Sequence, residues 1–244
     1  MKTLIFTHLY QRPDTTAESL ARLRGLLDLW LDHLRGPGKY TGDIILFTNL
    51  ERIERDGLLL RPMPNVPVDQ RRAHMHRILC YDLVPAGDYD VALQADLDVL
   101  AVDDVNPLFP KDESLWAAPS DLLMLEWRHA WTLLPKWQRA AYKLTGWRMA
   151  EPGASACVVA SRTSVWERNF GSWARLIRAH GDRPAPHLGD QSFLNVLRLK
   201  KSVPMSCWPR ELIVHNNWDT RRNGAKLLHF PGARKAFMPQ YRMV

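Results

Sequence analysis

The sequence predicts an α/β fold with a mainly parallel central sheet, on the strength of three observations. Short apolar runs typical of buried strands alternate along the chain with segments whose apolar residues recur at helical spacing. The chain has 244 residues, 46% of them hydrophobic, which is enough to bury a sizeable core. The sequence shows no internal repeat, low-complexity tract or linker. We therefore expect one domain spanning residues 1–244.

The predicted elements follow one another in a regular order. Strands are expected at residues 3–10, 42–49, 57–64, 89–101, 114–120 and 154–161. Helices are expected at residues 15–36, 68–85 and 163–180, and a further one follows a loop within residues 187–201. The first helix has the clearest signals, because it starts near Thr16 and Ser19 and stops at Gly36, Pro37 and Gly38. In such a sheet, ligands bind beyond the carboxyl ends of the strands.

Charge and cysteine usage narrow the function classes. A formal net charge of +7 and a pI of about 9.5 favour an anionic partner: nucleic acid, acidic lipid or a phosphorylated small molecule. Cys80, Cys157 and Cys207 lack the spacing of metal sites or disulfide frameworks, which suits a reducing compartment. The first apolar run is too short for a signal peptide, and none approaches the roughly 18 residues of a membrane span. We expect a cytoplasmic protein.

Asp96 and Asp98 stand near the carboxyl end of the apolar run 89–101. Residues two apart on an extended strand point to the same side, so both carboxylates can converge on one ligand. At about 4 Å apart they would repel by roughly 4 kcal/mol at an effective dielectric near 20. A divalent cation with oxygen ligands would offset that repulsion. The alternative is a solvated acidic loop, in which water screens the two charges.

Three segments together resemble glycosyltransferase family 8, the group of glycogenin and the bacterial lipopolysaccharide galactosyltransferases. ADLDVLAVDDVNPLF (95–109) resembles the family's D-x-D segment, which closes with Pro-Leu-Phe or Pro-Leu-Trp. GDQSFLN (189–195) is similar to its D-Q-x-x-x-N segment, and HFPGARK (229–235) to its H-x-x-G-x-x-K segment. The segments keep the family's order, and the resemblance runs from residue 3 to residue 235. It implies a GT-A fold and a retaining enzyme that transfers a sugar from a nucleotide diphosphate sugar, commonly UDP-linked, with bound Mn²⁺.

The resemblance assigns metal binding to Asp96, Asp98 and His229. A nitrogen ligand beside carboxylates suits Mn²⁺ better than Mg²⁺, which stays the alternative cofactor. The cation would act as a Lewis acid on the diphosphate leaving group. The other interpretation of His229 is a packed or surface histidine. Asp190 and Gln191 are the expected catalytic residues on the reacting face of the sugar, and Asp190 could equally cap the following helix.

The other positions that match the family would bind the nucleotide sugar. They are Thr7, His8, Tyr10, Arg77, Asp96, Ser155, Gly232 and Lys235. Tyr10 would stack on uracil or, alternatively, pack in the core. Lys235 would meet the diphosphate, and Gly232 would allow close backbone approach. Arg77 would face the phosphates, and four nearby residues could do so in its place: Arg71, Arg72, His74 and His76.

The sequence departs from the family pattern in two places. Residues 155–157 read Ser-Ala-Cys where the family usually shows Asn-Ala-Gly or Asn-Ser-Gly. Ser155 could still donate one hydrogen bond to the sugar, but the two-ended grip of Asn is lost. Residues 236–237 read Ala-Phe where the family has Pro-Trp. The first departure bears on donor choice, and the second bears on the packing of the segment over the donor.

Two further features concern the acceptor. Five tryptophans gather in one region: Trp116, Trp127, Trp131, Trp137 and Trp147. They are candidates for an acceptor wall, and the alternatives are core packing or a subunit interface. From residue 220 onward there are six Lys or Arg and no acid. Arg221, Arg222 and Arg242 could rest on the anionic inner face of a membrane, or form a solvated tail.

The resemblance to glycosyltransferase family 8 thus implies a metal-dependent glycosyltransferase that acts on a glycan or lipid-linked glycan acceptor in surface glycan biosynthesis. One alternative is a nucleotide-sugar hydrolase or nucleotidyltransferase with a similar site. Another is a non-catalytic sugar-nucleotide-binding module. A nucleic-acid-binding protein would explain the positive charge, but the sequence contains no recognition motif for it.

Overall fold

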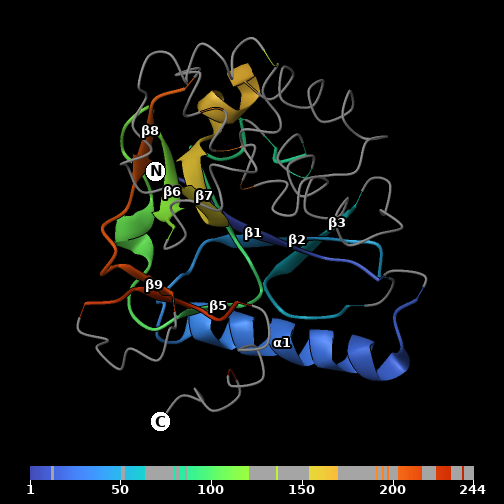
Figure 1. Ribbon diagram of the computed structural model, residues 1–244. Coiled ribbons are helices and arrows are strands. Elements are labelled where there is room, and N and C mark those ends of the chain that lie inside the picture. Colours follow the sequence, from blue (N-terminus) through green and yellow to red (C-terminus); the bar gives the residue numbers. More distant parts are fainter. Residues whose placement is uncertain are drawn as a thin grey trace.

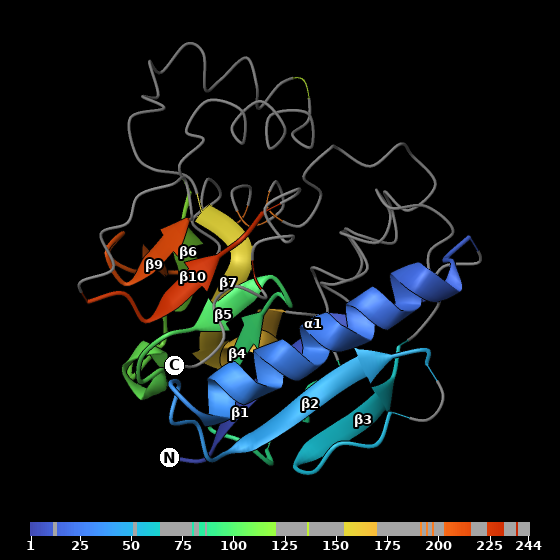
Figure 2. The ribbon, with the colours of Figure 1, turned by 90° about the horizontal axis from the view of Figure 1, so that it is seen from below.

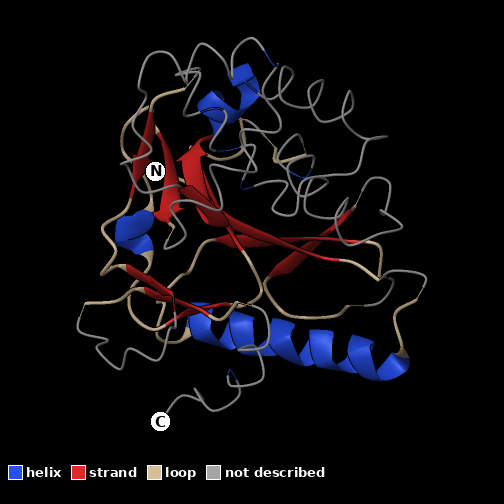
Figure 3. Cartoon of the chain, viewed as in Figure 1, coloured by secondary structure: helices blue, strands red, loops and turns tan. Residues whose placement is uncertain are grey.

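A central sheet lies over a long helix in the described part of the chain, and a smaller sheet lies beside that helix (Figures 1 and 3). The computed structural model describes residues 1–11, 14–50, 53–63, 80, 83–85, 87–120, 136, 154–169, 191, 194, 197, 203–215, 224–231 and 238. Within these residues, no helix combines the length and the apolar composition that crossing a bilayer requires.

The larger sheet confirms the predicted, mainly parallel arrangement. Its strands in the described residues are β1 (Thr3–Leu9), β2 (Asp43–Thr48), β3 (Leu58–Pro62), β4 (Val91–Ala95), β6 (Leu115–Pro119), β7 (Ala154–Arg162) and β8 (Met205–Cys207). They lie in the order β3-β2-β1-β4-β7-β6-β8, and β7 alone among them runs antiparallel to its neighbours. The carboxyl ends of β1 and β4, which are neighbours, therefore meet at one edge of the sheet.

Helix α1 (Ala17–Arg35) covers one face of this sheet (Figure 2). The hydroxyl of Thr16 accepts a hydrogen bond from the Ser19 backbone N–H at 3.1 Å, which caps the first turn as predicted. The chain leaves the helix at Gly36, and the N–H of Gly38 donates to the His33 carbonyl at 2.8 Å. A Cβ atom at Gly38 would lie 2.6 Å from the Leu34 carbonyl oxygen, so only glycine fits this tight exit.

The predicted strand 89–101 is wrong as a single element. The structure divides it into β4 and β5 (Val99–Ala101), which belong to different sheets. Between them the chain turns, and the Val99 N–H donates to the Asp96 carbonyl at 3.0 Å. Apolar runs on both sides of the turn concealed it, because periodicity does not mark a change of sheet. Asp96 and Asp98 thus lie in a turn, not on an extended strand.

The smaller sheet has the order β5-β10-β9 in the described residues. Its other strands are β9 (Ile213–His215) and β10 (Leu227–His229), and β10 runs antiparallel to β5. The sequence pattern does not predict β8, β9 or β10, since three residues are too few to show a period. This sheet packs against the helix through a buried cluster that contains Leu26 of α1, Leu100 of β5 and Leu228 of β10.

Separate apolar clusters fill the two faces of the larger sheet. The cluster on the α1 side contains Ile5 and Leu9 of β1 together with Trp30 of the helix. The cluster on the opposite face contains Leu4 and Phe6 of β1. Successive residues of β1 thus point to alternate faces, as a strand buried on both sides requires.

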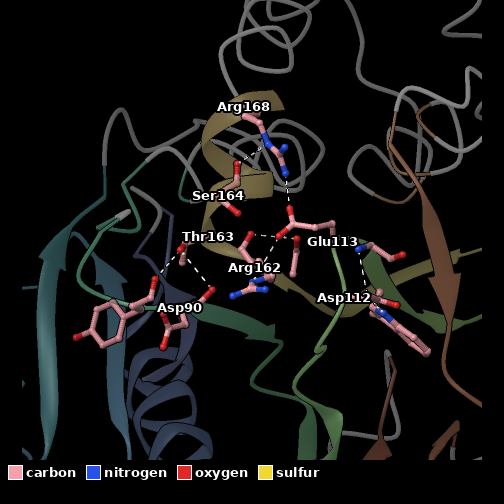
Figure 4. Close-up of polar contacts among 11 residues, drawn as sticks. Asp90, Asp112, Glu113, Arg162, Thr163, Ser164 and Arg168 are labelled. Carbon is pink, nitrogen blue, oxygen red and sulfur yellow. Dashed lines mark hydrogen bonds and ion pairs between the residues drawn. The ribbon is translucent and has the colours of Figure 1, made fainter. Parts of the chain in front are cut away.

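Polar contacts connect the end of β7 and the residues after it to the chain at the amino ends of β4 and β6 (Figure 4). Thr163, which follows β7, donates its hydroxyl to the Tyr89 carbonyl at 2.5 Å and its N–H to the Asp90 carbonyl at 3.1 Å. The carboxylate of Glu113 forms ion pairs with Arg168 and, at 3.6 Å, with Arg162. These contacts tie β7 to its neighbours at the end of the sheet opposite Asp96.

Other predicted elements lie mostly outside the described residues. Residues 163–169 are helical, as are the positions of Cys80, Gln191, Leu194 and Leu197. The remainder of the predicted helices 68–85, 163–180 and 187–201 falls on residues that the structure does not describe, apart from 83–85.

Tyr40 joins the amino ends of β1 and β2 beneath the sheet. Its side chain is 1% exposed, and its hydroxyl lies 2.9 Å from the Thr3 carbonyl oxygen and 3.1 Å from that of Asp43. The ring stacks on Phe109 at a centroid distance of 5.7 Å. Burial raises the pKa of Tyr40 to about 12, because the phenolate would lose its hydration.

We expect Tyr40→Phe to lower the free energy of unfolding at pH 7 by about 1–2 kcal/mol, since the partly buried carbonyls of Thr3 and Asp43 lose the hydroxyl that donates to them. In the unchanged protein the pKa of Tyr40 lies above the ordinary value of 10.0, so its contribution is complete below pH 10 and disappears as the pH approaches 12.

Urea unfolding at pH 7, 9 and 11 measures both effects. The stability of Tyr40→Phe should fall less between pH 9 and pH 11 than that of the unchanged protein. A residual fall is expected from Tyr89, whose pKa burial also raises to about 12. Equal falls in the two proteins would contradict the proposed role of the Tyr40 hydroxyl.

Candidate functional site

Residues 96–98, here called the D-x-D turn, lie at the carboxyl end of β4 and are held from two sides by backbone hydrogen bonds. The Asp96 N–H donates to the Cys157 carbonyl of β7 at 2.9 Å. The Asp98 carbonyl accepts from the Phe230 N–H, directly after β10, at 2.8 Å. The turn is therefore fixed where the two sheets meet.

The pairing of β10 with β5 in the smaller sheet places His229 beside the D-x-D turn. On β10 it pairs with Val99, the residue that follows Asp98. Its Nε2 lies 3.7 Å from Asp98 Oδ1, and both side chains are buried. Two of the three predicted metal ligands, far apart in the sequence, thus face each other.

The side chain of Gln94, on β4, also binds the D-x-D turn. Its side chain is 2% exposed, and its Nε2 donates to Asp96 Oδ1 at 2.8 Å. Gln94 is not among the predicted site residues. The available signal was a single amide in the otherwise apolar run VALQA, two positions before Asp96.

The pair of Asp98 and His229 fits a divalent cation in donor chemistry and in spacing. A carboxylate oxygen and an imidazole nitrogen that bind one metal at about 2.1 Å each stand roughly 3–4 Å apart, and the facing atoms here are 3.7 Å apart. Among the described residues, however, no group of three or more His, Cys, Asp or Glu side chains is gathered closely enough for a metal. The structure thus brings together two of the predicted ligands, while the carboxylate of Asp96 is held by Gln94.

The predicted base-binding residues, which lie in β1 and directly after it, fall on two faces of the sheet. Thr7 lies between Ile5 and Leu9, on the α1 side, and is fully buried. His8 and Tyr10 are half-buried, and Tyr10 packs against the cluster on the opposite face. Strand alternation therefore keeps His8 and Tyr10 together and removes Thr7 from them.

Ser155 is buried in an irregular part of β7. The ladder with β6 shifts there, since Ala117 pairs with Val159 while Ala118 pairs with Ser155. This irregularity coincides with the Cys157 carbonyl that binds Asp96. The Ser155 hydroxyl lies 3.5 Å from the Cys157 backbone nitrogen, so it contacts its own strand.

Gln191 occupies a helical position and is half-buried. Leu194 and Leu197, which also occupy helical positions, are buried in the cluster that Tyr10 adjoins, on the sheet face away from α1. Four predicted site residues lie outside the described residues, and they are Arg77, Asp190, Gly232 and Lys235.

Of the five clustered tryptophans, the structure describes Trp116. Its ring packs against Trp208 at a centroid distance of 6.0 Å, and its Nε1 donates to Asp112 Oδ1 at 3.0 Å. Trp116 lies in β6 and packs against the cluster on the α1 side of the sheet. For this tryptophan the structure therefore shows core packing, which was the alternative to an acceptor wall. Trp127, Trp131, Trp137 and Trp147 fall outside the described residues, as do Arg221, Arg222 and Arg242.

Comparison with solved structures identifies the fold. The chain is similar to mouse xyloside xylosyltransferase 1 (TM-score 0.60, 12% identity), covering 94% of this chain and 97% of that one. It is also similar to the galactosyltransferase LgtC, solved with donor and acceptor sugar analogues (TM-score 0.59, 13% identity, covering 99% and 97%). The bifunctional glycosyltransferase WbbM gives a TM-score of 0.61 at 13% identity, covering 95% of this chain and 46% of that one.

The similarity lies in the fold and not in the sequence. No protein-family model and no curated protein sequence matches the chain. At these low identities the shared architecture establishes the fold alone, and it confirms the expected GT-A fold.

We expect Thr7→Val to raise the free energy of unfolding by about 1 kcal/mol, because it replaces a buried hydroxyl with a methyl group. Within the described residues, the Oγ1 of Thr7 has no hydrogen-bond partner. Urea unfolding measures the change. Thr48→Val is the matched control and should lose stability, because the Thr48 hydroxyl accepts from the Leu50 N–H at 3.0 Å. A loss of stability in Thr7→Val would contradict the expectation.

Proposed function

We propose that the chain is a retaining glycosyltransferase that transfers a sugar from a nucleotide diphosphate sugar, most simply a UDP-sugar, to a glycan or lipid-linked glycan. The observation that carries the proposal is the contact between Asp98 and His229 at the carboxyl end of β4. Each residue belongs to a different segment that resembles glycosyltransferase family 8. The GT-A fold, shared with solved glycosyltransferases, supports the same reading.

In this proposal Asp98 and His229 hold a divalent cation, with Asp96 beside them in the same turn. Mn²⁺ suits this mixed oxygen and nitrogen donor set, and Mg²⁺ is the alternative. When bound, the cation supplies positive charge that stabilises the nucleoside diphosphate leaving group. The nearly buried position of Asp98 and His229 strengthens their electrostatic interaction with that charge, since little water screens it.

The remaining residues have binding and orienting roles in the proposal. Tyr10 stacks on the base from the sheet face that it shares with His8. Lys235 binds the diphosphate, and Gly232 lets the backbone approach it. Asp190 would bind sugar hydroxyls and support the transition state, and Gln191 would lie nearer the anomeric carbon, where the bond to the nucleoside diphosphate breaks and the bond to the acceptor oxygen forms with retention of configuration.

The acceptor and the cellular setting belong to the proposal as well. Trp127 and Trp131 are candidates for the acceptor wall, since aromatic rings cover sugar faces. The basic residues Arg221, Arg222 and Arg242 would bring a cytoplasmic enzyme to an anionic membrane face, where a lipid-linked acceptor resides. A single domain over residues 1–244 would carry the whole activity.

A second candidate is a binding module without turnover. The observation that favours it is the serine at position 155, where the family shows asparagine, together with the contact of its hydroxyl with its own strand. Such a module would bind the nucleotide sugar and Mn²⁺ but release no nucleoside diphosphate, either with or without a sugar acceptor.

A thermal-shift panel of nucleotide sugars, with and without Mn²⁺, tests the proposal. We expect a UDP-sugar to raise the melting temperature only when Mn²⁺ is present. At about 100 times Kd the stabilisation is roughly 2.7 kcal/mol, which corresponds to about 5–10 °C for a chain of this size.

Asp98→Asn should abolish this shift, because it keeps the shape of the side chain and removes the charge. Asp56→Asn, which makes the same change at an exposed aspartate near β3, is the matched control and should keep the shift. Release of UDP only when an acceptor is added marks a transferase, and release without acceptor marks a hydrolase. An equal shift with and without Mn²⁺, or in Asp98→Asn, would overturn the metal assignment.

A further inference from the structure

Gln94 is a polar residue at a position that the sheet surrounds with apolar ones. In β4 it pairs with Phe6 of β1 on one side and with Val159 of β7 on the other. The rest of the strand is valine, alanine and leucine. Burial of an amide in such surroundings is unfavourable unless it forms hydrogen bonds, so this glutamine calls for an explanation beyond packing.

The explanation lies in its contact with Asp96. The amide Nε2 of Gln94 donates to Asp96 Oδ1 at 2.8 Å. The backbone of Asp96 is fixed as well, through its N–H to Cys157 and its carbonyl to Val99. Main chain and side chain of Asp96 are thus both held, and an aspartate held in this way loses the torsional freedom that ligand binding would otherwise have to remove.

The chemistry of the donor matters for what Asp96 can bind. A lysine or arginine at position 94 would also reach a carboxylate, but its positive charge would compete with a cation for Asp96. An amide orients the carboxylate through hydrogen bonding and leaves its net negative charge in place. Residues that donate a hydrogen bond to a metal-binding side chain orient that side chain and strengthen metal binding.

We propose that Gln94 is a positioning residue that holds the carboxylate of Asp96 in the orientation needed to bind a Mn²⁺–nucleoside diphosphate group. The inference rests on the proposed function, because it assigns Gln94 a role only if the D-x-D turn binds such a group. It goes beyond the resemblance, which assigned nothing to position 94.

Calorimetric titration of Mn²⁺ in the presence of UDP tests the role. Gln94→Met keeps the length of the side chain and removes the donor, and we expect Mn²⁺ affinity to fall by about 10–100-fold. Leu93→Met is the matched control, since it introduces the same residue at the neighbouring position of β4 on the opposite sheet face and should leave the affinity unchanged. Urea unfolding of both variants separates lost binding from lost folding.

The outcomes distinguish this inference from the function on which it rests. If the unchanged protein binds no Mn²⁺ with UDP, the proposed function fails and the role of Gln94 fails with it. If the unchanged protein binds and Gln94→Met binds equally well, the role of Gln94 is overturned while the function stands. Should Gln94→Met not fold, Gln94→Asn provides the second test. It keeps the amide but is one methylene too short to reach Asp96, and it should show the same loss of affinity.

Discussion

The candidate site depends on one constraint, which is the pairing of β5 with β10. This antiparallel ladder sets His229 opposite Val99 and lets Phe230 bind the Asp98 carbonyl. An imidazole from the last part of the chain thereby reaches a carboxylate from the middle of it. Hydrogen bonds between main-chain groups fix this juxtaposition, so the geometry does not depend on the long, flexible side chains that surface ion pairs use.

Two carboxylates in one partly buried turn would otherwise be unfavourable, and the structure counters this with different partners for each. Asp98 faces His229, while Asp96 accepts from Gln94 and is tied to the irregular part of β7. Backbone hydrogen bonds and side-chain contacts therefore meet at the same three residues, 96–98. The hydrogen bond from Gln94 satisfies part of the Asp96 carboxylate, which makes its position in a partly buried turn less unfavourable.

Sequence patterns predicted the parts of this architecture that have a strong local signal. The long helix α1, with its cap at Thr16 and exit at Gly38, and the strands β1, β2, β3, β6 and β7 follow from apolar periodicity and turn residues. The division of 89–101 did not, because β4 and β5 are both apolar and only long-range pairing separates them. Thr7 shows a related limit: the motif placed it with His8 and Tyr10, but strand alternation turns it to the other face. The sequence shows Gln94 as the one amide in an apolar run, but its contact with Asp96 depends on the turn at residues 96–98, which the sequence pattern did not predict.

The position of β10 in the middle of the smaller sheet also has a consequence for the order in which the molecule is assembled. On the ribosome, β1, α1, β2 and β4 emerge early, and their mutual contacts can form while the rest of the chain is still being made. His229, whose imidazole faces Asp98, lies on β10 and is synthesised long after Asp98. A nascent chain can therefore already contain β1, α1, β2 and β4 while the acidic turn still lacks this imidazole, so the site is completed later than the part of the core beside which it lies.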